Sequence, residues 1–192
     1  MGDEPVFRLR GAALLGEVFV SVEKWYILAI DQAERSGWAV VEMPDLRLVA
    51  SGVASNHLER TIAVARACEL AGDCPLRVIF EDHSDIPARS GFQTATLLGM
   101  GAARGHWETS LAIVGVKQAH FAHKATSKAW RWSVFRKAGG STEQWKDRAI
   151  KWASAFAKRP IADHNEAEAI CLAAFGGRNV PQPRATKKRK AA

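Results

Sequence analysis

The chain has 192 residues, 47% of them hydrophobic, and a formal net charge of +7 at pH 7, so it can bury the core of one domain without disulfides or a structural metal. Its three cysteines are odd in number and form no Cys-x-x-Cys pair, which argues against a disulfide framework or a thiolate zinc site and indicates a reducing compartment. No apolar run approaches the roughly 18 residues of a membrane span, so we expect a cytoplasmic protein, in the host cytoplasm if the source is viral.

The first part of the chain alternates between strand and helix patterns. Apolar runs and turn residues predict, in order, strands near 25–31, 37–42 and 46–54, a helix over 57–71, a strand at 76–81, a helix from about 92 to 108, and a short strand between 113 and 121. The N-terminal residues 1–24 are expected to form an extension, and their structure is left open.

Three helices are expected in the second part, over 126–138, 142–158 and 163–175. Ser141 and Gln144 have capping-box spacing at the start of the second of these helices, and Pro160 ends it. Gly176 and Gly177 are expected to end the last helix. This order predicts an α/β fold with a central mixed five-stranded sheet flanked by helices on both faces, over residues 25–177, and a basic tail without regular structure over 178–192.

Four acidic residues follow or open these elements. Asp31 ends the first strand, Glu81 ends the strand at 76–81, and Asp163 and Glu166 are three residues apart at the start of the last helix, which gives them one helix face. Taken singly, each acid is also typical of a turn or a helix cap. Together they predict a cation site, and ligation by oxygen alone favours magnesium, with manganese as a substitute. Glu168, two residues after Glu166, is expected to face elsewhere.

The order of these motifs resembles the RuvC-like Holliday junction resolvases of the ribonuclease H-like superfamily. The motifs that carry the resemblance are the strand that ends in Asp31, the small-Gly pair Ser36-Gly37 that opens the next strand, the strand that ends in Glu81, the glycine-containing helix at 97–105, and the acid-x-x-acid helix from Asp163. The chain has Gln32-Ala33 where the family commonly has Pro-Gly, and Glu166 where it usually has Asp. These departures suggest a phage or otherwise divergent member.

The resemblance implies a ribonuclease H-like fold and a homodimer that cuts four-way DNA junctions in recombination and repair. Two-metal hydrolysis would use Asp31, Glu81, Asp163 and Glu166 as metal ligands, with Lys146 as a further catalytic residue that stabilises the transition state. Two alternatives stay open. The first is a related nuclease for other branched or RNA-containing substrates, and the second is a non-catalytic DNA-binding protein whose acids are structural.

Charge along the chain supports a polyanionic partner. Residues 117–159 carry eleven Lys or Arg against two acids, whereas residues 1–116 carry more acids than bases. Such a basic segment can hold a DNA backbone beside an acidic metal site, and the basic tail adds non-specific DNA binding. The DNA-contacting residues that we predict are Arg131 as a phosphate clamp, together with Lys146, Arg89, Phe92, Lys124 and Lys128. Trp130 or Trp132 is a candidate for stacking on an unpaired base.

Overall fold

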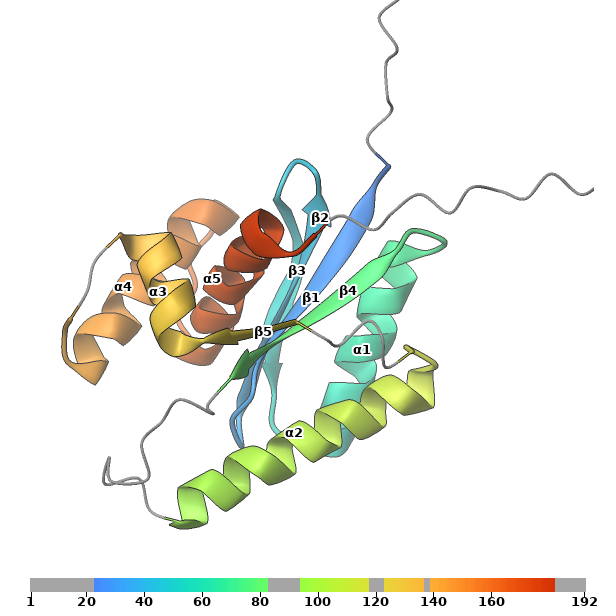
Figure 1. The fold of residues 1–192 in the computed structure, drawn as a ribbon, viewed down its shortest axis with the longest axis horizontal. Coiled ribbons are helices and arrows are strands. Elements are labelled where there is room, and N and C mark those ends of the chain that lie inside the picture. Colours follow the sequence, from blue (N-terminus) through green and yellow to red (C-terminus); the bar gives the residue numbers. More distant parts are fainter. Residues whose placement is uncertain (1–22, 83–93, 118–122, 137–138, 182–192) are drawn as a thin grey trace, which may run out of the picture.

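The computed structural model describes residues 23–82, 94–117, 123–136 and 139–181. A five-stranded sheet forms its centre, with the strand order β3-β2-β1-β4-β5 (Figure 1). β1 pairs antiparallel with β2 and parallel with β4, β2 pairs antiparallel with β3, and β4 pairs parallel with β5. The strands are β1 (Trp25–Asp31), β2 (Ser36–Met43), β3 (Arg47–Ala54), β4 (Leu76–Asp82) and β5 (His123–Thr126).

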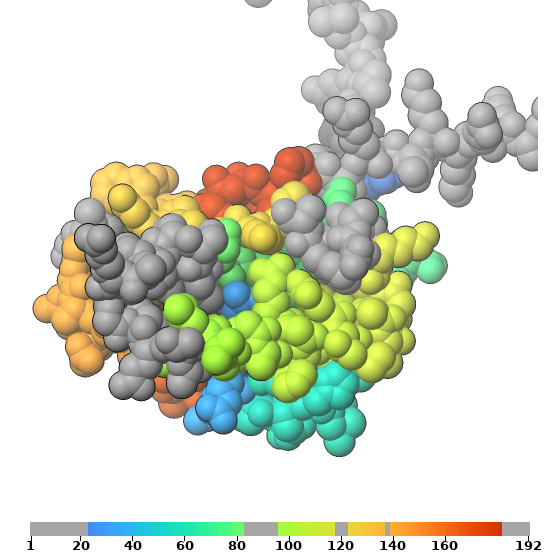
Figure 2. Space-filling view, turned by 60° about the horizontal axis from the view of Figure 1, so that its bottom comes forward, coloured from blue at the N-terminus to red at the C-terminus, as the bar shows by residue number. Residues whose placement is uncertain are grey.

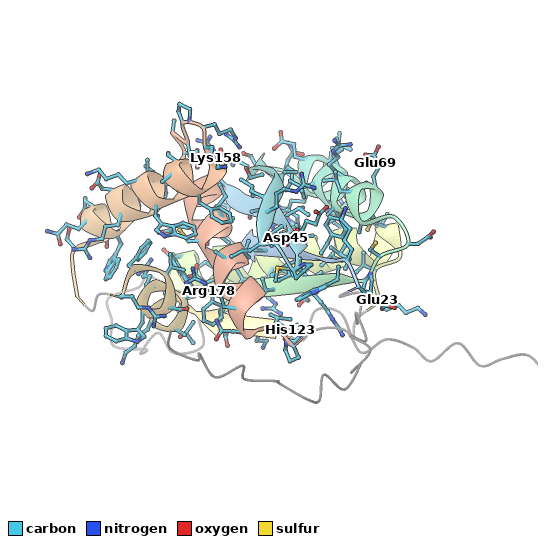
Figure 3. The ribbon with its side chains drawn as sticks, turned by 90° about the horizontal axis from the view of Figure 1, so that it is seen from above. Glu23, Asp45, Glu69, His123, Lys158 and Arg178 are labelled. Atoms are coloured by element: carbon cyan, nitrogen blue, oxygen red, sulfur yellow. The ribbon has the colours of Figure 1, made fainter. Side chains whose placement is uncertain are left out.

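Five helices cover the two faces of this sheet. They are α1 (His57–Ala71), α2 (Thr94–Val114), α3 (Ser127–Phe135), α4 (Thr142–Ala157) and α5 (His164–Asn179). α1 and α2 lie on one side, and α3, α4 and α5 lie on the other (Figure 1). Figure 3 labels Glu69 on α1, Lys158 at the end of α4 and Arg178 on α5. The predicted mixed sheet with helices on both faces is therefore confirmed.

The core has two halves because successive side chains of a strand point to opposite faces. Ile27 and Ala29 of β1 pack into the half that contains α5, while Leu28 and Ile30 pack into the half that contains α1 and α2. All four side chains are fully buried. β1 thus reads as a continuous apolar run, as expected for a central strand that is covered on both sides.

The position that we predicted for the fifth strand is wrong. We expected a strand between residues 113 and 121, but α2 continues to Val114 and β5 begins at His123. Ala103, Trp107 and Leu111 are buried at helical spacing, and this stripe extends the helix past the predicted end near residue 108. The capping box of Ser141 and Gln144 is confirmed at the start of α4.

α5 does not end at its two glycines as predicted. It continues to Asn179, and a Cβ at Gly176 would lie 3.4 Å from the side chain of Ile27. A Cβ at Gly177 would lie 2.3 Å from the side chain of Leu46. The glycines therefore allow close packing of α5 on the sheet and on the turn between β2 and β3. The predicted boundary at residue 177 falls inside this helix, and the predicted extension and tail lie almost wholly outside the described residues.

Close contact between β2 and the start of α5 explains the glycine that opens β2. A Cβ at Gly37 would lie 1.8 Å from the backbone oxygen of Asn165, a contact that a side-chain movement cannot relieve. Any larger residue at this position must push the N-terminus of α5 away from the sheet. That N-terminus carries the acidic residues singled out above.

Gly37→Ala should lower the free energy of unfolding by about 3 kcal/mol or more, because it forces a backbone shift in a packed core. Gly99→Ala on α2 is the matched control, because a Cβ there meets nothing within 4 Å and alanine favours a helix by about 0.5–1 kcal/mol. Urea unfolding of both variants gives the two values. Equal stability of Gly37→Ala and the wild type would contradict the close approach of β2 and α5.

Candidate functional site

Three carboxylates converge at one edge of the sheet. Asp31 at the end of β1, Glu81 at the end of β4 and Glu168 on α5 each offer an oxygen atom, and these atoms lie within 4.8 Å of one another. Asp31 and Glu81 are only 5% and 3% exposed. β1 and β4 are parallel neighbours, so their carboxyl ends meet at the same edge. We call Asp31, Glu81 and Glu168 the carboxylate group.

The carboxylate group concentrates negative charge in a place with little water. Burial and the neighbouring Glu81 and Glu168 raise the pKa of Asp31 well above its ordinary value. Burial, followed by the charge of Glu81, raises the pKa of Glu168 to about 7, although Arg131 and Lys146 lower it in part. The protein's own cations therefore compensate the group incompletely. Such a site favours a bound cation, and oxygen donors alone suit Mg²⁺ or Mn²⁺.

α3 holds Glu81 in position. The hydroxyl of Ser127 and the indole Nε1 of Trp130 both donate hydrogen bonds to Oε1 of Glu81, the second at 2.8 Å. Trp130 is buried, so it is a structural donor and not the base-stacking residue that we considered. Trp132, two residues later, is exposed, so base stacking by Trp132 stays a prediction.

Arg131 lies beside the carboxylate group. Its Nη2 atom is 3.5 Å from Oε1 of Glu168, and its guanidinium carbon lies 5.2 Å and 5.6 Å from the ring centroids of Trp130 and Trp145. Contacts with two aromatic rings restrict the direction in which this cation can point. Lys146 on α4 also acts on Glu168, since its charge lowers the pKa of that residue.

Asp163 and Glu166 are not part of the carboxylate group, contrary to our expectation. Asp163 is the N-cap of α5, where its carboxylate accepts the amide of Asn165 at 2.8 Å and pairs with Arg35 at 2.7 Å. Glu166 accepts hydrogen bonds from Ser51 and Arg159, both at 2.7 Å. These two acids are occupied in fixing the helix start to β3 and to the segment after β1.

Glu168 takes the place that we expected Glu166 to fill. Two residues along a helix correspond to a rotation of about 200°, so the face that carries Glu166 cannot also carry Glu168. The sequence shows only that Ala167 and Ala169 flank Glu168, and the structure buries both alanines fully. The acid-x-x-acid spacing instead indicated Asp163 and Glu166, of which Asp163 is the helix cap.

The predicted DNA-contacting residues fall in three places. Lys124 is on β5 and Lys128 is exposed on α3, the helix that carries Arg131. Lys146 is half-buried on α4. Arg89 and Phe92 lie outside the described residues.

None of the helices in the described part of the chain combines the length and the apolar character needed to cross a membrane.

The segment between β1 and β2, residues 32–35, is tied to three helices. Arg60 on α1 donates to the backbone oxygen of Glu34 at 2.6 Å and contacts Nδ1 of His106 on α2 at 2.9 Å. Arg35 forms the ion pair with Asp163 at the start of α5. The backbone that follows Asp31 is therefore held from both sides of the sheet.

Comparison with known proteins gives likenesses in structure. No protein-family model and no curated protein matches the chain. RuvC of Thermus thermophilus in complex with a Holliday junction substrate matches with a TM-score of 0.57 and 13% identity, over 79% of this chain and 92% of that chain. The structure of T. thermophilus RuvC alone matches with a TM-score of 0.54 and 13% identity, over 80% of this chain and 95% of that chain.

At 13% identity this likeness shows the fold. The chain has the RuvC-like, ribonuclease H-like α/β fold, and that prediction is confirmed. The likeness does not bear on a phage origin, which stays a prediction.

Without divalent metal, the free energy of unfolding should fall as the pH rises from about 4.5 to about 7. Folded Glu168 keeps its proton up to about pH 7, whereas the unfolded chain loses it near the ordinary value of 4.5, so the folded state binds more protons over this range. The loss should be on the order of 1–3 kcal/mol. Urea unfolding in a chelator at several pH values measures it.

Glu168→Gln should flatten this dependence, and Mg²⁺ should restore the stability of the wild type at pH 7. The exposed Glu69→Gln on α1 serves as the control and should leave the dependence unchanged. The same slope in Glu168→Gln as in the wild type would contradict a shared buried charge at this position.

Proposed function

We propose that the protein is a metal-dependent endonuclease that cuts branched DNA, with the four-way junction as its substrate. The observation that carries this proposal is the carboxylate group, in which acids from β1, β4 and α5 bring their oxygen atoms within 4.8 Å of one another. Its setting in a RuvC-like fold supports the proposal, because one of the similar structures is RuvC in complex with a Holliday junction substrate.

The metal ligands in this proposal are Asp31, Glu81 and Glu168. They fit a divalent ion because all three offer carboxylate oxygen, and because their charges are buried together with incomplete compensation. Two such ions, Mg²⁺ or Mn²⁺, would supply activated water and stabilise the leaving oxygen of a phosphodiester. Asn165 precedes Glu168 by three residues and so shares its helix face, where its amide oxygen could add a neutral ligand.

The basic residues near the site have distinct tasks in this proposal. Arg131 clamps the phosphate, since a guanidinium held between two rings can present two parallel N–H groups. Lys146 offsets charge that develops in the transition state. Lys124 and Lys128 contact the DNA backbone, as would Arg89, Phe92 and the basic tail, although these last lie outside the described residues.

The decisive experiment compares cleavage of a synthetic four-way junction with cleavage of a linear duplex of the same sequence, with and without Mg²⁺. Cleavage of the junction alone supports the proposal. Cleavage of flaps, forks or RNA–DNA hybrids in preference to the junction would favour the related nuclease instead. Binding without cleavage under any divalent metal would favour a non-catalytic DNA-binding protein.

Two neighbouring glutamates on α5 give a matched pair for the metal assignment. Glu168→Gln should lower the single-turnover cleavage rate by about a thousandfold or more, because it removes a metal ligand. Glu166→Gln should retain most of the activity, because Glu166 is engaged with Arg159 and Ser51. The measurement is single-turnover kinetics at saturating Mg²⁺, with the affinity for the junction measured separately. Full activity in Glu168→Gln would exclude Glu168 as a ligand.

Cutting two strands of a junction requires two active sites, so we also propose a homodimer. α2, which crosses the front of Figure 2, offers a surface for it. Leu98 and Ile113 on this helix are among the exposed large apolar residues, and a Cβ at Gly105 between them would meet nothing within 4 Å. Exposed apolar side chains around a small residue are typical of a helix that packs against a second copy.

Leu98→Glu should convert the dimer to a monomer and weaken paired cutting of the junction, because it introduces charge into the proposed interface. Leu58→Glu on α1 is the control, since Leu58 is 68% exposed and Leu98 is 69% exposed. Light scattering during gel filtration measures the mass of both variants. A monomeric wild type, or a Leu98→Glu variant that stays dimeric, would exclude this interface.

A further inference from the structure

The side chain of Arg148 on α4 is held in one orientation without an acidic partner. Its guanidinium carbon lies 4.6 Å from the ring centroid of Trp145, and its Nη1 atom donates a hydrogen bond to the backbone oxygen of Gly139 at 3.2 Å. Among the described residues, no carboxylate forms an ion pair with Arg148. The fold therefore orients this charge but does not neutralise it.

Gly140, which directly precedes the capping box of α4, makes room for the guanidinium of Arg148. Gly140 has a φ of +143°, a backbone conformation that other residues rarely adopt. A Cβ at this position would lie 3.1 Å from Nη1 of Arg148. Fixing an arginine side chain between a ring and a loop costs up to about 2 kcal/mol of conformational entropy, which an arginine that only faces solvent does not lose.

Trp145 connects Arg148 to the carboxylate group. The guanidinium carbon of Arg131 lies 5.6 Å from the same ring centroid, and Nη2 of Arg131 is 3.5 Å from Oε1 of Glu168. The ring of Trp145 is buried, and Phe135 of α3 stacks on it, where α3 and α4 lie side by side (Figure 1). One fixed indole ring thus links the cation beside the carboxylate group to a second cation on α4.

The chemistry of Arg148 suits a phosphate of a DNA strand. A planar guanidinium presents N–H groups that match phosphate oxygens, and no described residue accepts a hydrogen bond from Nη2 or Nε of Arg148. A carboxylate of a second protein would also fit a guanidinium. The shared ring with Arg131 favours the phosphate, because the proposed function brings DNA to Arg131.

We propose that Arg148 binds a second phosphate of the strand that Arg131 holds at the carboxylate group, and that it thereby directs this strand across α3 and α4. Both cations contact one ring, so they are close enough to hold phosphates of neighbouring nucleotides. The inference rests on the proposed function for the presence of DNA at the carboxylate group. It adds the direction in which the bound strand leaves that group.

The first test measures the salt dependence of junction binding by fluorescence anisotropy, in the Glu168→Gln background, which should bind without cutting. Arg148→Gln should lower the junction affinity about tenfold and make the slope of log affinity against log salt shallower by about 0.9, the value of one phosphate contact. Lys151→Gln on the same helix is the matched control, because Lys151 is exposed and pairs with Asp147. It should leave the slope nearly unchanged.

The second test locates the contact on the DNA and does not depend on the stability of a variant. The cut position is first mapped with the wild type, and each phosphate within two nucleotides of it is then replaced, one at a time, by a neutral methylphosphonate. At one of these positions the replacement should weaken binding of the Glu168→Gln protein about tenfold. It should have almost no effect at that position when Arg148→Gln is also present, because the contact is already lost.

An unchanged salt slope in Arg148→Gln would overturn the inference, as would a methylphosphonate effect that is the same with and without Arg148. A fall in molecular mass on gel filtration of Arg148→Gln, with the salt slope retained, would assign Arg148 to a carboxylate of a second protein copy and would also overturn it. Junction binding and cleavage without a contact from Arg148 leave the proposed function standing, whereas a protein that binds no branched DNA removes both.

Discussion

The structure at this end of the sheet must hold three carboxylates whose oxygen atoms lie within 4.8 Å of one another. Burial, followed by the repulsion between the carboxylates, raises the pKa values of Asp31 and Glu168, so the surrounding structure must hold the carboxylates together. Two parallel strands supply the first two acids, and α5 presses the third against them. The glycines of α5 permit that approach, since Cβ atoms there would meet Ile27 and Leu46.

α3 holds the carboxylates in position and supplies a compensating cation. Ser127 and Trp130 of α3 hold Glu81 by hydrogen bonds, and Arg131 of the same helix supplies a cation 3.5 Å from Glu168. One short helix therefore provides both orientation and partial charge compensation. The large apolar body of Trp130 also closes this side of the core, so the packing of α3 and the geometry of the acids are set together.

The sequence predicted Asp31 and Glu81 because a strand end is a local property: an apolar run stops, and the next residue sits at the edge. On α5 it predicted Asp163 and Glu166, whereas Glu168 is the acid that lies near Asp31 and Glu81, because the face of a helix that meets a sheet depends on packing, which spacing alone does not determine. Asp163 is the N-cap of α5, and Glu168 lies on the face of this helix that meets the strands. The same reason explains α2 and α5, whose predicted ends were wrong because buried contacts carried both helices further.

The contacts of Arg60 have a mechanical consequence. This side chain on α1 touches His106 on α2 and holds the backbone oxygen of Glu34, three residues after Asp31. Its Nε atom makes no hydrogen bond to the described residues, so the guanidinium depends on those two partners for its orientation. α2 and the segment beside Asp31 are therefore joined through one arginine side chain, so a substitution of Arg60 would remove both contacts at once.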